Sequence, residues 1–220
     1  MEKLQTCCGI VGGGPAGLML GFLLARAGVE VLVLEKHADF LRDFRGDTIH
    51  PSTLELMHEL GLLNEFLQRP HQEARELSAR VGQDTVRLAD FTHLPTHCKF
   101  LAFMPQWDFL NFLVEQGKLY PGFHIELQAE VTDLIEDAGH IAGVVAKTPK
   151  GTLEVRAPLT VGADGRHSMV RERGTAAGTS YAAVYPGLAV GTYTVWRDHD
   201  TPVGTVTIDG GRVTRYRWPL

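Results

Sequence analysis

The chain has 220 residues, 44% hydrophobic and 21% charged, and this composition is typical of a soluble globular protein rather than a disordered or fibrous one. Its net charge of −5, without a basic run interleaved with aromatic residues, argues against a nucleic-acid surface. The longest apolar run, Ala16 to Ala25, is far shorter than the about 20 residues that a membrane span requires, and the 3 cysteines do not make a disulfide framework. We therefore expect a soluble, cytoplasmic protein.

The first predicted elements form a βαβ unit. A strand-like run over Thr6 to Val11 leads into a glycine-rich turn, a helical pattern ends at Gly28, and an apolar strand over residues 30–35 ends in Glu35. A GxGxxG motif alone is a weak signal in a chain with 24 glycines, but this strand, helix and acid supply the context of a dinucleotide-binding unit. The turn comprises Gly12, Gly13, Gly14, Pro15, Ala16 and Gly17.

Each position in this turn has an expected task. Gly12 permits the tight turn, Gly14 lets the backbone approach a pyrophosphate, and Gly17 removes a Cβ that would hold the helix off the sheet. The phosphates would then lie on unpaired N–H groups at the helix start. Glu35 lies close to the spacing for a ribose-binding acid, which favours FAD or NAD over NADP. The alternative is a glycine-rich turn followed by an ordinary surface glutamate.

In the middle of the chain, the hydrophobic pattern predicts helices around a small sheet. Residues 52–66 have helical spacing, and Ser52 followed by Glu55 is a capping box. Residues 74–103 favour β structure and would form part of a substrate-side sheet outside the βαβ unit. A second helix is predicted over residues 106–119.

Short strands follow, over residues 125–134, 141–148 and 152–156, and they predict a β meander. The next strand, from Pro158, ends in Asp164-Gly165 before a helix-like segment. Ligands of open α/β sheets bind at the carboxyl ends of strands, so Asp164 is expected to reach the same cofactor as the glycine turn. A plain Asp-Gly turn is the alternative.

The residue composition and the hydrophobic pattern change from Gly174 onward. Strands are predicted over residues 192–196, 203–208 and 212–218, rich in Thr, Val, Tyr and Trp. We expect an FAD-binding domain over residues 1–173 and a β-rich tail over residues 174–220 that is either truncated or unrelated. The tail resembles the closing strands of a prealbumin-like or carboxypeptidase-regulatory β sandwich.

Together these motifs resemble the class A FAD-dependent aromatic monooxygenases, the para-hydroxybenzoate hydroxylase-like family. The order and spacing agree over about residues 5–173. The motifs are the glycine turn, Glu35-Lys36, Arg45-Gly46, Pro105-Gln106-Trp107 at a helix start, and Gly162-Ala163-Asp164-Gly165.

The resemblance implies an α/β fold: a Rossmann-like FAD-binding domain with an inserted β meander, a partial substrate-side sheet and a β-rich tail. It implies that the glycine turn, Glu35 and Lys36 bind FAD, that Arg45 and Gln106 contact it, and that Val131 lies near the adenine. It further implies that Asp164 supports binding of FAD and of NAD(P)H as co-substrate. The implied reaction is hydroxylation of a small aromatic substrate by a flavin hydroperoxide.

Several alternatives remain open at this stage. Gln106 could cap its helix, and Pro95 between His93 and His97 prevents a shared helical face, so no metal site is expected. Family members are nearly twice as long and carry a second flavin-contacting Gly-Asp motif that this sequence does not show. A catalytically incomplete FAD- or nucleotide-binding fragment is therefore the second hypothesis. An NAD-dependent dehydrogenase is disfavoured, because a meander follows instead of further βαβ repeats.

Overall fold

The computed structural model describes residues 2–41, 47–176, 191–196 and 202–208. The chain divides into two compact units, Met1–Ser180 and Tyr181–Leu220. In the second unit, β14 (Gly191–Trp196) and β15 (Pro202–Ile208) pair antiparallel, which confirms two of the three strands predicted for the tail. The third predicted strand, over residues 212–218, lies outside the described residues.

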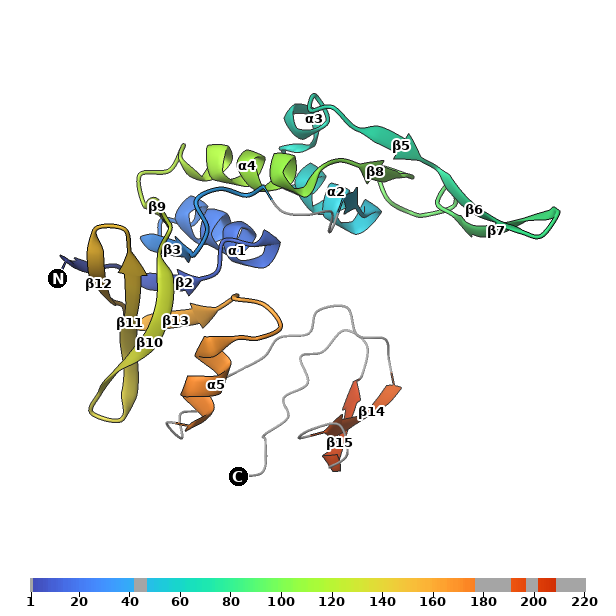
Figure 1. Cartoon of the computed structure of the whole chain (residues 1–220). Coiled ribbons are helices and arrows are strands. Elements are labelled where there is room, and N and C mark those ends of the chain that lie inside the picture. Colours follow the sequence, from blue (N-terminus) through green and yellow to red (C-terminus); the bar gives the residue numbers. More distant parts are fainter. Residues whose placement is uncertain (1, 42–46, 177–190, 197–201, 209–220) are drawn as a thin grey trace. The chain divides into compact units, whose positions relative to one another are not determined.

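The first unit is built on a four-stranded parallel sheet (Figure 1). The register aligns the carboxyl ends of its strands, because Val11 pairs with Gly162 on one side and with Leu34 on the other. Whatever follows these residues must lie along one edge of the sheet. In spatial order the strands are β13 (Leu159–Gly162), β2 (Cys8–Val11), β3 (Val31–Glu35) and β9 (Phe123–Leu127).

Apolar residues on both faces of this sheet explain why its strands read as continuous hydrophobic runs. Val31 and Val33 are fully buried in the larger core with helices α1 (Pro15–Arg26) and α4 (Gln106–Gly117). The alternate residues Leu32 and Leu34 are buried in a second core with the meander. The parallel sheet is thus covered by helices on one face and by β structure on the other.

The meander is a four-stranded sheet in which β1 (Glu2–Gln5) joins three strands from much later in the chain. β1 pairs in parallel with β12 (Gly151–Arg156), a long-range pairing that the sequence did not predict. The other pairs are antiparallel hairpins. These strands are β10 (Glu130–Asp137), β11 (His140–Thr148) and β12 (Gly151–Arg156).

The single strand expected over residues 125–134 is wrong, because this segment forms two strands in different sheets. β9 belongs to the parallel sheet and β10 to the meander. Gln128 between them has a positive φ of 56°, and the backbone N–H of Ala129 donates to the carbonyl of Glu35. This turn redirects the chain from one sheet to the other beside the end of β3.

Between β3 and β9 lies the region for which the sequence predicted a substrate-side sheet. Residues 74–103 contribute to two small sheets rather than one: a three-stranded sheet in the order β4-β8-β5 and the hairpin β6-β7 (Figure 1). The strands are β4 (Thr48–Ile49), β5 (Gln72–Ala74), β6 (Glu76–Val81), β7 (Asp84–Asp90) and β8 (Leu101–Phe103).

The helix predicted over residues 52–66 is two helices, α2 (Pro51–Glu59) and α3 (Leu63–Phe66). Gly61 lies between them with a positive φ of 76°, a conformation that favours glycine and ends the first helix. The predicted capping box is also wrong. His50 is the N-cap residue, Pro51 begins the helix, and Glu55 instead accepts the backbone N–H of His97 at 2.6 Å.

Cys7, Cys8 and Cys98 are free thiols. Burial, and secondarily the neighbouring Cys7, raises the pKa of the Cys8 thiol, so Cys8 acts as a small core residue of β2. None of the helices in the described part of the chain is long and apolar enough to cross a membrane.

Candidate functional site

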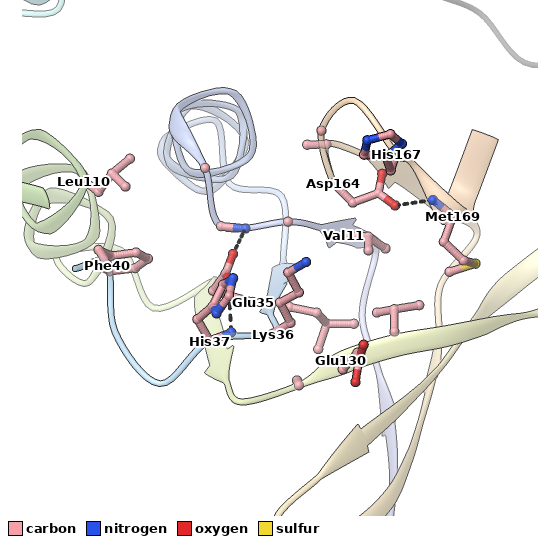
Figure 2. Close-up of a pocket in the computed structure, with 18 of the residues that line it drawn as sticks. Val11, Glu35, Lys36, His37, Phe40, Leu110, Glu130, Asp164, His167 and Met169 are labelled. Carbon is pink, nitrogen blue, oxygen red and sulfur yellow. Dashed lines mark hydrogen bonds and ion pairs between the residues drawn. The ribbon is translucent and has the colours of Figure 1, made fainter. Parts of the chain in front are cut away.

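A pocket of about 380 Å³ lies at the carboxyl edge of the parallel sheet (Figure 2). It collects segments that are far apart in the sequence, namely the ends of β2, β3 and β13 and the starts of α4 and β10. The predicted site residues that line it are Gly12, Gly13, Gly14, Glu35, Lys36, Gln106, Val131 and Asp164. Pro15, Ala16 and Gly17 form the first turn of α1 immediately behind the loop, and Arg45 lies outside the described residues.

Gly12 and Gly17 are required by packing within the protein. Gly12 has a φ of 107°, and a Cβ there would overlap the carbonyl group of Ala163 in the Asp-Gly strand. A Cβ on Gly17 would overlap the carbonyl oxygen of Gly12. The two glycines therefore let the loop fold tightly between α1 and the end of β13.

Gly14 is different, because a Cβ at this position would meet no protein atom within 4 Å. It is the N-cap residue of α1, with Pro15 as the first helical residue. The N–H groups of the first helical turn have no intrahelical acceptors and carry the positive end of the helix dipole. The open space in front of Gly14 thus suits an anionic group such as a pyrophosphate.

Glu35 is a buried carboxylate that holds the glycine loop. Its Oε2 accepts the backbone N–H of Gly13 at 2.8 Å, and its Oε1 accepts the backbone N–H of His37 at 3.0 Å (Figure 2). A Cβ on Gly13 would lie 2.8 Å from the Cβ of Glu35. Glu35 is therefore no ordinary surface glutamate, because its carboxylate faces the pocket and braces the loop.

Asp164 lies on the other side of the loop and is bonded to the start of α5 (Met169–Ala176). Its Oδ1 accepts the hydroxyl of Ser168 at 2.6 Å, and its Oδ2 accepts the backbone N–H groups of Met169 at 2.7 Å and Val170 at 3.3 Å. Gly165 turns with a φ of 87°. The Asp-Gly pair therefore makes a turn whose acid lines the pocket and caps the next helix.

Gln106 and Val131 line the pocket from α4 and β10. Gln106 is the first residue of α4, after the N-cap residue Pro105, and its backbone N–H lies 3.4 Å from Oδ1 of Asp47. Its side chain therefore does not provide the N-cap bond considered in the sequence analysis.

Sequence reasoning missed several pocket residues. His37 lies two residues after the predicted acid Glu35, and His167 lies two residues after Gly165 of the Asp-Gly pair, so their positions beside the motifs were the available signal. The apolar wall had no local signal, because it comes from core positions that converge only in the fold. The additional lining residues are Val11, Leu34, His37, Phe40, Leu110, Ala129, Glu130, Ala163, Gly165, His167 and Met169.

Two acids therefore flank β2 at one edge of the sheet, with Glu35 at the end of β3 and Asp164 just after β13. Between them lies a loop with open space at Gly14 and the start of a helix. These features fit a ligand with ribose hydroxyls and a pyrophosphate. Within the described residues, no group of three His, Cys, Asp or Glu side chains is placed to hold a metal ion. The fold and pocket define a dinucleotide-binding α/β protein.

A comparison with protein families identifies which family of dinucleotide-binding proteins the chain belongs to. The family profile described as FAD binding domain matches residues 4–205, and the chain belongs to this family. FAD is accordingly its cofactor, and the resemblance to FAD-dependent aromatic monooxygenases is confirmed. The match also extends past Arg173 into the tail.

The chain is similar to curated monooxygenases from Streptomyces. It is 34% identical to the 6-methylpretetramide 4-monooxygenase of Streptomyces rimosus over 163 residues, which are 74% of this chain and 39% of that protein. It is also 34% identical to the rifampicin monooxygenase of Streptomyces venezuelae over 165 residues, covering 74% of this chain and 32% of that protein. The chain thus spans between about a third and two fifths of these relatives.

Solved structures agree with the fold. The p-nitrophenol 4-monooxygenase of Pseudomonas putida superposes with a TM-score of 0.69 at 25% identity, over 89% of this chain and 46% of that one. The anhydrotetracycline hydroxylase of Streptomyces rimosus gives a TM-score of 0.67 at 29% identity, over 86% of this chain and 36% of that one. The α/β fold expected from the sequence is confirmed.

Proposed function

We propose that this chain is an FAD-dependent monooxygenase that hydroxylates a small aromatic compound at the expense of NAD(P)H, in the cytoplasm. The observation that carries the proposal is the convergence of Glu35, the glycine loop and Asp164 on one pocket. The relatives' names support the reaction type, because both Streptomyces proteins are monooxygenases.

The proposed binding mode follows the order of these groups along the sheet edge. Glu35 would accept hydrogen bonds from the adenosine ribose, and the N–H groups at the start of α1 would bind the pyrophosphate. Val131 would lie near the adenine, with Lys36, Gln106 and, from outside the described residues, Arg45 as further contacts. Asp164, on the opposite side of β2, would meet the second half of the dinucleotide.

Bound FAD would supply the redox and oxygen chemistry of hydroxylation. The contribution of this chain is to bind and orient the cofactor with backbone donors and two carboxylates. Its apolar pocket wall, which includes Phe40 and Leu110, would keep water from that part of the ligand.

A second candidate is a protein that holds FAD without substrate turnover. It is favoured by the lining of the pocket, because the described polar lining residues lie in or beside the cofactor-binding motifs. It shares the FAD site with the first candidate, so the two differ only in turnover.

The test is to purify the chain, remove bound nucleotide, and titrate it with FAD while following flavin fluorescence and absorbance. Oxidation of NADH and NADPH is then measured with and without a panel of phenols. Saturable one-to-one FAD binding and phenol-stimulated oxidation of a reduced nicotinamide are the expected results.

The possible outcomes separate the candidates. FAD binding with no phenol-stimulated oxidation would favour the binding protein and remove the monooxygenase proposal for this chain. A folded chain that fails to bind FAD at tens of micromolar would contradict both candidates.

A further inference from the structure

We infer that the outer edge of strand β6 is a pairing surface for a second copy of this chain, with the two β6 strands antiparallel and centred on Ser78. The surface is the row of backbone groups at Glu76, Ser78 and Arg80, called the β6 edge below. It lies outside the described lining of the cofactor pocket and adds an assembly to the proposed function.

The β6–β7 hairpin is closed by a tight turn that fixes the direction of its backbone groups. The turn is Gly82-Gln83, with a φ of 64° at Gly82, and Val81 pairs with Asp84 across it. The closing pair of a two-residue hairpin is hydrogen-bonded, so the backbone groups of Val81 point toward β7. Because this direction alternates along a strand, those of every second residue before Val81 point toward β7 as well.

The intervening residues Glu76, Ser78 and Arg80 therefore direct their N–H and C=O groups away from β7, along the β6 edge. Among the strands that the structure describes, β6 pairs with β7 alone, in a two-stranded sheet (Figure 1). Glu76, Ser78 and Arg80 are exposed, whereas Leu77 and Ala79 between them are half-buried. An unpaired edge is a template for a further strand, and a hairpin gains stability when a third strand joins it.

The charges along β6 are complementary to a second copy of the same strand. Antiparallel pairing about Ser78 places Glu76 opposite Arg80 of the second copy and, by the two-fold symmetry, Arg80 opposite its Glu76. Leu77 then lies opposite Ala79. Opposite charges on directly paired residues stabilise a sheet, and this register also sets outward backbone groups against outward ones.

Strand β7 offers a poorer edge for the same contact. Leu88 lies between Arg87 and Ala89, which pair with consecutive residues of β6, so β7 carries a bulge that interrupts a regular ladder. Pairing of two β7 strands about their central residue would place Arg87 opposite Arg87 and Asp84 opposite Asp90. Like charges directly opposite each other are destabilising. The hairpin is therefore suited to self-pairing through β6.

The competing cause of self-association is the apolar face of the hairpin, where Val81 is 64% and Leu88 is 66% exposed. Apolar association does not depend on which sign of charge each copy carries. Pairing through the β6 edge does, because Glu76 and Arg80 meet only across the two copies. Two charge variants that fail alone and pair with each other therefore separate these causes.

The experiment is sedimentation equilibrium of the full chain from about 1 to about 200 µM, where we expect a wild-type dimer. Arg80→Glu and Glu76→Lys each place like charges opposite each other, and each should weaken self-association at least about tenfold. An equimolar mixture of the two should recover the dimer, because every acid again lies opposite a base. Glu76→Lys also removes a contact of 3.8 Å with Arg87, an exposed pair that contributes little.

Lys150→Glu is the matched control, since it makes the same change of charge as Arg80→Glu at an exposed position in the β11–β12 turn. It should leave the dimer unchanged, and circular dichroism establishes that each variant is folded. A wild-type chain that stays monomeric throughout this range would overturn the inference. So would folded charge variants that associate as well as wild type, or a mixture that associates no better than its components.

Discussion

At the scale of single residues, the glycines of the loop are present for different reasons. Gly12 and Gly17 leave room for carbonyl groups of the protein itself, and Gly13 leaves room for the side chain of Glu35. Gly14 alone faces open space. Substitution at Gly14 should therefore affect the ligand, whereas substitution at the other three should affect the fold first.

Replacing Gly14 with valine should block FAD while leaving the protein folded. The valine side chain would occupy the space in front of the helix start, and we expect FAD affinity to fall by about a hundredfold or more. Stability should fall by no more than about 1 kcal/mol, since valine is a poorer N-cap residue than glycine. FAD titration and thermal unfolding measure the two effects, and Gly14→Ala should give a smaller loss of affinity. A Gly14→Val protein that retains FAD normally would contradict the assignment of this space to the pyrophosphate.

Single positions of the site were predictable from the sequence, whereas contacts between residues far apart in the chain were not. The roles of Gly12 and Gly17 were predictable, because the motif and its flanking strand and helix are continuous in the chain. The bond from Gly13 to Glu35 was not, since it joins residues 22 positions apart and depends on side-chain geometry. The three bonds at Asp164 were hidden for the same reason, although the acid itself was identified.

At the scale of elements, the β6–β7 hairpin ends in Asp90, a carboxylate whose ionised form is stabilised by neighbouring donors. Asp90 accepts the hydroxyl of Thr92 at 2.6 Å and its backbone N–H at 2.9 Å, and Arg87 donates to it at 3.1 Å. The hydrogen bonds from Thr92, with smaller contributions from His93 and Arg87, hold the pKa of Asp90 below its usual value. A lowered folded-state pKa gives stability that is present above the usual carboxyl pKa and is lost as the pH falls through the folded value.

Asp90→Asn should therefore be less stable than wild type at pH 7, and the difference should close as the pH falls below about 4. The midpoint of thermal unfolding, measured from pH 7 to pH 3, checks this prediction. Asp84→Asn, at the other end of β7, serves as the control for replacing a strand-end carboxylate. A difference for Asp90→Asn that stays constant across this range would rule out the charge as its cause.

Helix α2 gives a second prediction at this scale, because its start differs from the capping box in the sequence. Ser52 is exposed and follows Pro51, so Ser52→Ala should change stability by less than about 0.5 kcal/mol. Glu55→Ala should cost more, about 1 kcal/mol, because it removes the acceptor for the N–H of His97. Urea unfolding of both variants measures the contrast, and a larger loss for Ser52→Ala would restore the capping-box interpretation.

Local patterns predicted the elements better than their pairing. The βαβ unit was predictable because its strand, turn and helix are contiguous. The switch at Gln128 was not, because the apolar pattern of residues 125–134 continues through it while the chain changes sheets. The pairing of β1 with β12 joins Lys3 to Glu154, and no periodicity in the sequence encodes so distant a partner.

At the scale of the whole molecule, the cofactor pocket and the tail belong to different units. The described residues that line the pocket lie between Val11 and Met169, in the unit Met1–Ser180, whereas β14 and β15 belong to Tyr181–Leu220. The two acids, the glycine loop and helix α5 likewise lie in the first unit. The described lining of the pocket therefore comes from the first unit.

A chain shortened to residues 1–180 should accordingly bind FAD with an affinity within about threefold of the full chain, which corresponds to less than about 1 kcal/mol. The two proteins are compared by FAD titration, with circular dichroism to establish that the shortened chain is folded. Gly14→Val in the shortened chain should abolish binding there as well, which ties the retained affinity to the same pocket. A folded 1–180 protein that binds FAD more than tenfold more weakly would show that residues 181–220 contribute to the site, because the described pocket residues are retained in the shortened chain.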